Sequence, residues 1–284
     1  MKYGFIKEHC DEHSVALMCP LFSVSRSGYY AWLHYIPSNR FLANKKLDEE
    51  IVSVFIDNKS RYGSPRITKE LNKKGMDCTY KRVAKRMQIM NLKALAKRKF
   101  KVTTDSAHTK PVYENILNRD FTTTAVNQKW AGDITYIATE QGWLYLAVII
   151  DLHSRAIIGW SMNARMTKQL VCDALLMALF NRKFPEGVLV HTDRGSQYCS
   201  KKYRSIMANN KLIGSMSRRG NCWDNAISES FFHTLKVELI HQNKYLYKEQ
   251  AQRSIFQYIE GYYNKKRMHS AIDYKTPYEV ECSK

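Results

Sequence analysis

Strand and helix patterns alternate along the second half of the chain. Apolar and polar residues alternate over Trp130–Ala138, and the nearly continuous apolar run Trp143–Asp151 is typical of a central strand. Further patterns predict strands over Arg155–Met162, Gly187–Thr192 and Leu212–Met216, and helices from Thr167 to about Phe180, over Lys201–Asn209 and from about Ala226 to His241. This order predicts an α/β fold with flanking helices around a five-stranded sheet.

The first hundred residues follow a helical pattern instead. Apolar residues at helical spacing over 47–55 predict one helix. Ser64 and Pro65 open a second helix, which Gly75 closes. Thr79 caps a third helix over 80–91, with an apolar stripe on one side and basic residues on the others. A helix, a glycine-containing turn and a basic helix form the arrangement of a helix-turn-helix.

These patterns divide the chain into five regions. Residues 1–36 form a short helical region, 40–98 an all-α, basic, helix-turn-helix-like DNA-binding domain, and 99–127, which lack sustained periodicity, a linker. Residues 128–245 form the α/β core, and residues 246–284 a C-terminal helical segment that packs on this core.

Composition narrows the class of protein. Hydrophobic residues make up 44% of the 284, which favours a globular fold over disorder. The seven cysteines are scattered without a C-x-x-C pair, which suits a reducing compartment. The N-terminus has no signal-peptide pattern, and the longest apolar run, 143–150, is too short to span a bilayer. We expect a cytoplasmic protein with no membrane partner.

Charge is uneven along the chain. The formal net charge of the whole chain is +19. Residues 1–110 contain 22 basic and 10 acidic residues. Residues 80–104 contain nine Lys or Arg and no acid. Such segregation favours DNA as the partner, although a solvated basic face on an ordinary helical bundle is the alternative. The DNA-binding residues predicted in this region are Arg66, Lys81, Arg82, Lys85 and Arg86.

Three acidic residues suggest the chemistry. Asp133 lies in the first strand, Asp193 ends the fourth, and Glu229 lies in the first turn of the last core helix. A right-handed crossover from the meander of three strands would pair the fourth strand parallel to the first and place the two aspartates side by side. Three converging carboxylates repel unless cations bind, and oxygen ligands favour Mg²⁺ or Mn²⁺. Two such ions can activate water and stabilise the leaving oxygen of a phosphodiester.

The helix that begins at Ala226 supports this hypothesis. His233 and Lys236 return to the face of Glu229, whereas Ile227, Phe231, Leu235 and Leu239 form a separate apolar stripe. The helix can therefore dock on the sheet and present a carboxylate and a cation to DNA. An amphipathic helix with a solvated Glu–His–Lys face is the alternative.

Five motifs in order resemble a known family. The motifs are WAGDITYI, WLYLAVIIDLHSRAIIGWSM, VHTDRGSQY, DNAISESFFHTLK and YYNKKRMHSAI, with RYGSPRITKEL in the helical domain. They are similar to those of the OrfB-type transposases of bacterial insertion sequences, in the retroviral-integrase-like superfamily. Asp193 and Glu229 have 35 residues between them, the D-D-35-E spacing of that group. The resemblance implies an RNase H-like core with a mixed sheet, and Asp133, Asp193 and Glu229 as catalytic metal ligands.

The resemblance also implies a reaction and partners. The reaction is metal-dependent DNA cleavage followed by strand transfer, with two ions per site. Lys236 and Arg194 would contact phosphates, although solvation of the turn explains Arg194 equally well. Arg267, in the closing motif, would contact DNA or pack on the core. We expect a homo-oligomer on DNA and fusion to, or partnership with, the product of an upstream reading frame. A catalytically silent DNA-binding regulator and a cellular RNase H-like nuclease are the alternatives.

Several other polar residues are expected to have structural roles. Asp151 ends the second strand and is expected to cap the turn that follows rather than bind metal. His191 and His233 suit packing or hydrogen bonding at least as well as proton transfer. His9, Cys10, His13 and Cys19 do not supply a zinc pattern, because no C-x-x-C follows the two histidines.

Overall fold

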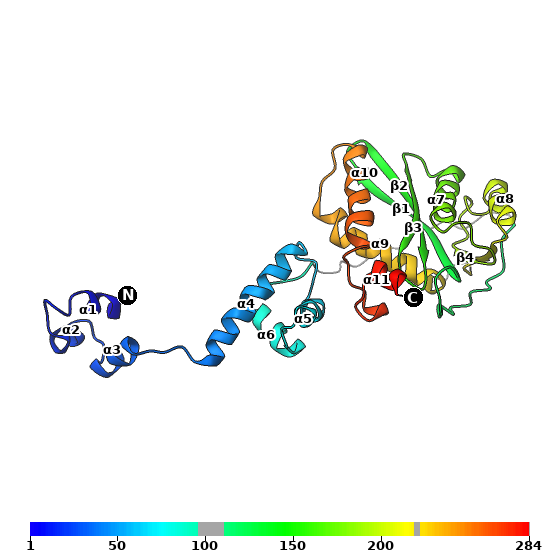
Figure 1. Cartoon of the computed structure of the whole chain (residues 1–284). Helices are drawn as coiled ribbons and strands as arrows, with labels where there is room; N and C mark the ends of the chain where they lie inside the picture. Colours follow the sequence, from blue (N-terminus) through cyan, green and yellow to red (C-terminus); the bar gives the residue numbers. More distant parts are fainter. Residues whose placement is uncertain (96–110, 219–221, 284) are drawn as a thin grey trace.

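A five-stranded mixed sheet forms the centre of the C-terminal part of the chain, on the right in Figure 1. The computed structural model describes residues 1–95, 111–218 and 222–283. The strand order is β3-β2-β1-β4-β5, with bounds β1 Lys129–Thr139, β2 Gly142–Asp151, β3 Ile157–Asn163, β4 Leu189–Thr192 and β5 Ile213–Met216. The strands β1, β2 and β3 form an antiparallel meander, and β4 pairs parallel to both β1 and β5. The predicted sheet and crossover are confirmed.

Helices cover both faces of the sheet. On one face, α7 (Lys168–Asn181) and α8 (Lys201–Asn209) share a buried cluster with Trp130, Ala147 and Ile149. On the other face, α9 (Ala226–Glu238) and α10 (Lys248–Phe256) pack against Leu146, Val148 and their neighbours. The alternate residues of β2 therefore enter two different cores, which explains why its sequence is apolar almost throughout.

Several predicted element boundaries differ from those of the structure by two or three residues: β4 begins at Leu189 instead of Gly187, and α6 (Tyr80–Ile89) ends at Ile89 instead of Asn91. Arg155 was placed in the third strand, but it lies in the preceding turn with a left-handed backbone (φ 63°), and β3 begins at Ile157. The helix α9 ends at Glu238 instead of near His241, because the backbone of Leu239 leaves the helical region (φ −131°, ψ −62°) and a short 3₁₀ turn follows.

The basic helical region contains α4 (Asn39–Asp57), α5 (Ser64–Lys73) and α6 (Tyr80–Ile89) around one apolar cluster. Gly75 has a φ of +81°, a conformation that glycine adopts without strain, and it follows α5 as expected. The Thr79 hydroxyl accepts the N–H of Arg82 (3.3 Å) and so caps α6. Val83 and Met87 are buried, which confirms the predicted stripe.

A smaller group of helices precedes this region. The helices α1 (Lys2–Glu8), α2 (Val15–Leu21) and α3 (Arg26–Leu33) enclose a cluster that includes Ile6, Cys19 and Tyr29. Figure 1 shows these helices as a group of their own beside the N-terminal end of α4. Cys19 is buried among apolar residues, and the ring of His9 contacts Glu12.

The predicted linker lies partly against the sheet. Residues 99–110 of it fall outside the described residues, and 111–127 contain no helix or strand. The described part nevertheless packs along β5: the N–H of Leu117 donates to the Ser215 hydroxyl (3.1 Å), and the N–H of Met216 donates to the carbonyl of Glu114 (3.3 Å). Leu117 is buried. This segment therefore covers the edge of the sheet.

The C-terminal segment joins the helical region to the core. A π-helical stretch, 257–263, continues α10, and the chain ends in α11 (Pro277–Cys282). Met268 is buried in the cluster formed by α4, α5 and α6, and the Tyr62 hydroxyl donates to the carbonyl of Lys266 (3.0 Å). In the described part of the chain, no helix has the length and apolar character needed to cross a membrane.

The contact of α7 with β3 generates a stability prediction. A Cβ added at Gly159 would lie 2.2 Å from the carbonyl oxygen of Ala174 and 2.6 Å from the amide nitrogen of Ala178. Gly159→Ala should therefore lower the free energy of unfolding by about 1–3 kcal/mol in urea titrations. The control Gly261→Ala, where a Cβ meets nothing within 4 Å, should be neutral or slightly stabilising. Equal stabilities of the two variants would contradict the close packing.

Candidate active site

Two aspartates lie next to each other where the parallel pairing of β1 with β4 ends: Asp133 lies within β1, and Asp193 directly follows β4. The last paired residues of β1 and β4 are Gly132 and Thr192, so Asp133 and Asp193 follow at matching positions. Side chains at matching positions of neighbouring strands point to the same face of a sheet. This face is the one on which Ala131 and Leu189 contact Ile227 of α9. The parallel pairing thus directs both carboxylates toward the helix that carries Glu229.

Backbone amides orient both aspartates. One carboxylate oxygen of Asp133 accepts the N–H of Ile134 (2.8 Å), and one oxygen of Asp193 accepts the N–H of Gly195 (2.9 Å). A Cβ at Gly195 would lie 2.9 Å from the Asp193 oxygen, so glycine allows the turn to close on the carboxylate.

The electrostatics of this pair are unfavourable without a counter-charge. Burial raises the pKa of Asp133 well above its usual range, and the charges of Asp193 and Glu229 raise it further. The buried Tyr198 hydroxyl lies in the same environment, where burial and the two aspartates raise its pKa. Two carboxyl groups in such a setting favour either a shared proton or a bound cation.

Glu229 faces the pair from the first turn of α9. Its side chain is largely exposed, and partial burial of its carboxyl group raises its pKa. Within residues 1–95, 111–218 and 222–283, no group of three or more His, Cys, Asp or Glu side chains is arranged to hold a metal ion. The structure therefore brings Asp133 and Asp193 together and leaves the Glu229 carboxylate on the facing helix, within electrostatic range of Asp133.

Lys236 lies on the side of α9 that faces these acids. Its ammonium nitrogen is 5.0 Å from the centre of the Tyr136 ring. Burial lowers the pKa of Lys236, while Tyr136 and Asp133 act in the opposite direction. Phe231 and Leu235 of the predicted apolar stripe are buried in the core. His233, predicted on the face of Glu229 and Lys236, instead lines a cavity with Ile227 and Phe231, whereas Lys236 lines another.

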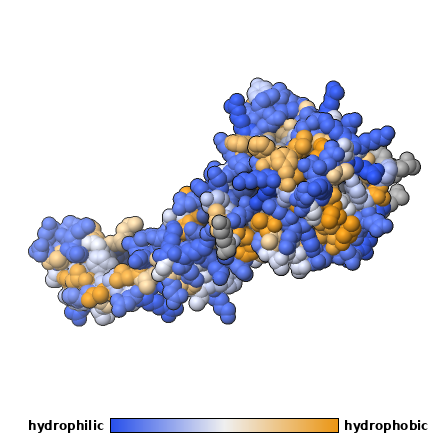
Figure 2. Space-filling view, turned by 45° about the vertical axis from the view of Figure 1, so that its right-hand side comes forward, coloured by the Kyte–Doolittle hydropathy of each residue, from blue (hydrophilic) through white to orange (hydrophobic). Residues whose placement is uncertain are grey.

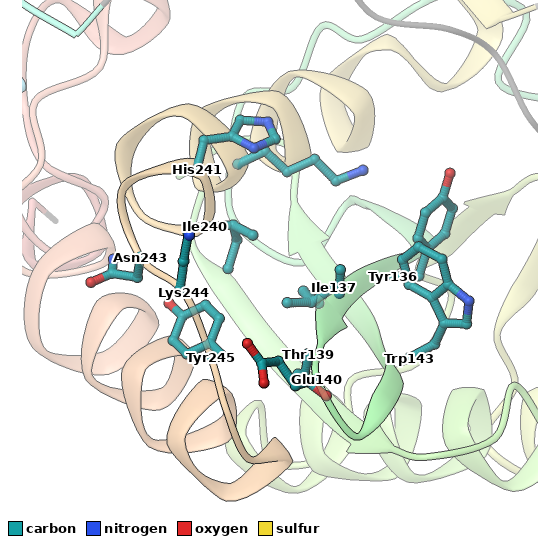
Figure 3. Close-up of a pocket in the computed structure, with 12 residues that line it drawn as sticks. Tyr136, Ile137, Thr139, Glu140, Trp143, Ile240, His241, Asn243, Lys244 and Tyr245 are labelled. Carbon is teal, nitrogen blue, oxygen red and sulfur yellow. The ribbon is translucent and has the colours of Figure 1, made fainter.

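A cavity of about 720 Å³ continues from Lys236 along the sheet. Tyr136 and Trp143 stand on one side of it and His241 and Lys244 on the other (Figure 3). The two aromatic rings form an edge-to-face pair with centroids 4.9 Å apart, and half of Trp143 is exposed. This exposed aromatic surface beside basic side chains was not predicted from the sequence.

The Arg194 side chain forms a hydrogen bond with another segment of the protein. Its Nε donates to the carbonyl of Ser217 at 2.7 Å and so links the ends of β4 and β5. This contact is neither of the two predicted roles, solvation of the turn and phosphate contact, and the phosphate contact of Arg194 stays a prediction.

The DNA contact predicted for Arg267 was wrong. Its side chain is 5% exposed, and its guanidinium donates to both oxygens of the Glu238 carboxylate at 2.7 and 3.0 Å. The interior ion pair raises the pKa of Arg267 and occupies the groups that a phosphate would need. Packing against the core, the other interpretation of this motif, is what the structure contains.

The basic residues of the helical region differ in accessibility. Lys81, Arg82 and Lys85 are exposed on α6, although Arg82 also donates to the Asn44 side chain at 3.0 Å. Arg86 forms an ion pair with Asp48 of α4, and Arg66 donates to the carbonyl of Met268 at 3.0 Å. Three of the five predicted residues thus remain at the surface of the helix.

Asp151 and His191 have structural contacts. Asp151 is 1% exposed and accepts the backbone N–H groups of Asn127, His153 and Ser154, as a turn cap does. The His191 ring is fully buried between the hydroxyls of Ser215 (2.9 Å) and Ser217 (3.1 Å).

Asp224 is a buried acid that sequence reasoning did not single out. Its carboxylate accepts the N–H of Arg218, the side-chain amide of Asn115 and the Nε of Arg119, each at 2.9 Å. These bonds tie the segment along β5 to the turn before α9. An acid in a Gly/Asn-rich loop carries no sequence signal for this role, because two of its three partners, Asn115 and Arg119, lie more than 100 residues away.

Known families match most of the chain. The model of the integrase core domain matches residues 123–222, a second integrase core model matches 211–277, and an HTH-like domain model matches 42–100. The two core models together include Asp133, Asp193 and Glu229.

Curated relatives match along nearly the full length. The chain is 48% identical over 283 residues to the transposase InsF for insertion sequence IS3A of Escherichia coli strain K12, covering 99% of this chain and 98% of that protein. It is 44% identical to an uncharacterized 31 kDa protein of insertion element IS600 from Shigella sonnei, covering 92% and 96%.

The similar solved structures have a lower sequence identity to this chain. The simian T-cell lymphotropic virus intasome in complex with a PP2A B56 gamma subunit gives a TM-score of 0.47 at 17% identity, covering 82% of this chain and 75% of that one. The HTLV-2 integrase catalytic core domain in complex with magnesium gives 0.41 at 18% identity, covering 55% and 97%.

His191 generates a prediction about pH. Burial lowers the pKa of its ring from 6.5 to about 4. As the pH falls below 6.5, the His191 ring therefore becomes protonated in the unfolded chain but stays neutral in the folded chain. The stability contributed by the neutral ring is fully present above pH 6.5. It is lost as the pH falls toward 4. Wild type should lose about 3 kcal/mol more than His191→Gln over this interval in urea titrations. Exposed His34→Gln should follow wild type; parallel losses in all three proteins would contradict the assignment.

Proposed function

Because this chain belongs to the family of insertion-sequence transposases that carry an integrase core domain, we propose that Asp133, Asp193 and Glu229 are the residues with which it cleaves and joins DNA. The observation that supports this assignment is the parallel pairing of β1 with β4, which places Asp133 and Asp193 side by side on the face covered by α9.

The three carboxylates suit a divalent cation, Mg²⁺ or Mn²⁺. Their oxygens are hard ligands, and the raised pKa of Asp133 marks a place where negative charge needs compensation. We propose that Asp133, Asp193 and Glu229 would together hold two such ions per site. Cations bound there supply the positive charge that stabilises a phosphodiester under attack and favours an ionised nucleophile.

The protein's own groups position the reactants. In the first step, water attacks the phosphorus at the end of the element, the bond to the 3′ oxygen breaks, and a 3′-OH is released. In the second step, that hydroxyl attacks a target phosphodiester in line and displaces its 3′ oxygen. Asp133 and Asp193 are fixed for this task by backbone N–H groups, and Lys236, beside Asp133, neutralises phosphate charge.

The helix α6 is the proposed recognition helix. It carries Lys81, Arg82 and Lys85 at its surface, and the preceding α5 and the Thr79 cap give it the layout of a helix-turn-helix. The sequence-independent part of its affinity would come from phosphate contacts made by these side chains.

We further propose that the chain works on DNA in the cytoplasm as an oligomer, together with the product of an upstream reading frame. Joining an element end to a target requires several DNA segments at once, and one chain carries one acidic site. Hydrophobic residues lie at the surface of the N-terminal region (Figure 2), where Leu17, Leu21 and Ile36 are each more than half exposed. Such residues suit a protein partner.

Substitution of the acids tests the catalytic assignment. Asp133→Asn, Asp193→Asn and Glu229→Gln should each lower Mg²⁺-dependent cleavage of element-end DNA by about 1000-fold or more, because neutral amides bind the cations poorly. DNA affinity, measured by fluorescence anisotropy, should stay within a few-fold of wild type. Glu249→Gln, at an exposed acid of α10, is the matched control and should cleave normally. Cleavage retained by any one of the three variants would remove that residue from the catalytic set.

Salt dependence tests the recognition helix. Lys81→Ala, Arg82→Ala and Lys85→Ala should each reduce the slope of log affinity against log salt by about 0.9, the value for one lost phosphate contact. Arg86→Gln should chiefly lower stability, since Arg86 pairs with Asp48, and Lys211→Ala on the core should alter neither property. An unchanged slope in all three α6 variants would refute the DNA-contact role of this helix.

A further inference from the structure

Four arginines line one cavity between the helical DNA-binding region and the core. The cavity has a volume of about 270 Å³, and Arg61, Arg66, Arg155 and Arg267 contribute to its wall. Hydroxyl groups of Ser230, Thr234 and Ser270 also line it. Glu238 is the single acid among the described residues of the wall, so the cavity carries a formal excess of positive charge.

The charge of Glu238 is already matched. Both of its oxygens accept hydrogen bonds from Arg267, and one also accepts the Tyr258 hydroxyl (2.8 Å). Arg61 stacks on the Tyr262 ring at 4.2 Å, and its Nε donates to the backbone carbonyl of Glu238 (3.3 Å) rather than to the carboxylate. Among the described residues, the Glu238 carboxylate thus accepts hydrogen bonds from Arg267 and Tyr258 and none from Arg61, Arg66 or Arg155.

Arg155 is the arginine of this cavity whose Nε is buried without a hydrogen-bond partner among the described residues. It lies in the turn before β3 with a left-handed backbone. Asp151 accepts three backbone N–H groups, and its charge acts on Arg155 without a hydrogen bond to the Arg155 Nε. A buried N–H group without an acceptor is costly, which makes a bound anion favourable there.

The neighbouring His269 lies close to the positive charges of these arginines. It lines the cavity, and burial together with the charges of Arg267, Arg66 and Arg155 lowers its pKa to about 2. The ring thus stays neutral although a carboxylate lies on the same wall. Burial is the larger cause of this lowered pKa, and the charges of the three arginines add to it.

We propose that this cavity binds a phosphate group of the DNA backbone, held by Arg155 and Arg66 with help from the Ser230 and Ser270 hydroxyls. Two features favour DNA over a small anion as the source. Ser230 directly follows Glu229 on α9, and Arg66 belongs to the helix before α6, so the cavity lies between the acids and the proposed recognition helix. The proposal rests on the proposed function only in taking DNA as the substrate.

Thermal unfolding of the full chain with inorganic phosphate tests whether the site exists. Against sodium chloride of equal ionic strength, phosphate at about ten times its dissociation constant should raise the unfolding midpoint of wild type by about 3 °C. Arg155→Gln should lose this response. Arg165→Gln, which removes an exposed arginine of the same domain, should keep it. The readout needs no catalysis, so it remains valid even if the acidic residues are wrongly assigned.

Salt dependence of binding to a DNA duplex of random sequence tests the source of the phosphate. Arg155→Gln should reduce the slope of log affinity against log salt by about 0.9, whereas Arg165→Gln should not change it. A phosphate response with an unchanged slope would overturn the DNA assignment in favour of a free anion. No phosphate response and no change in slope would overturn the site altogether and leave the arginines as a structural joint.

A second variant keeps the test independent of the folding of Arg155→Gln. Ser270 is exposed at the edge of the cavity, so Ser270→Asp places a carboxylate beside the arginines without removing any of them. Its unfolding midpoint without phosphate should exceed that of wild type, and its phosphate response should disappear. A full phosphate response in Ser270→Asp would show that phosphate binds elsewhere and would refute the proposal.

Discussion

The parallel register between β1 and β4 is the constraint on which the acidic site depends. It aligns Gly132 with Thr192 and therefore sets Asp133 beside Asp193. A shift of one residue would turn one of the carboxylates to the opposite face of the sheet. The pair is unfavourable by itself, since burial and mutual repulsion raise the pKa of Asp133. Two apolar cores, one on each face of the sheet, hold it in place.

The helix α9 connects the parts of the molecule. Its apolar stripe packs on the sheet, Glu229 and Lys236 face the aspartates, and its C-terminal end supplies Glu238 to the ion pair with Arg267. Arg267 lies in the segment that also carries Met268 into the core of the helical region. A continuous set of contacts therefore joins the proposed recognition helix to the acidic site, and the arginine cavity lies along it.

A large basic excess does not identify the residues that meet DNA. Arg86, Arg194 and Arg267 are engaged by Asp48, a backbone carbonyl and Glu238, whereas Lys81 and Lys85 remain exposed. Arginine suits such structural contacts because its planar, multi-donor group can serve several acceptors at once. In this chain the exposed lysines, together with arginines that lack an acceptor, are the better candidates for phosphate contacts.

The sequence by itself determined the element order, the sheet, the caps at Thr79 and Asp151 and the positions of the three acids. These features depend on local periodicity, turn chemistry and spacing, which a linear pattern carries directly. Only the tertiary structure decided that Arg267 is buried, that residues 111–127 cover β5, and that Arg61, Arg66 and Arg155 meet in one cavity. Those contacts join residues about 30 to 200 positions apart. Whether a basic side chain faces solvent, a carboxylate or a cavity depends on which distant segments pack against it.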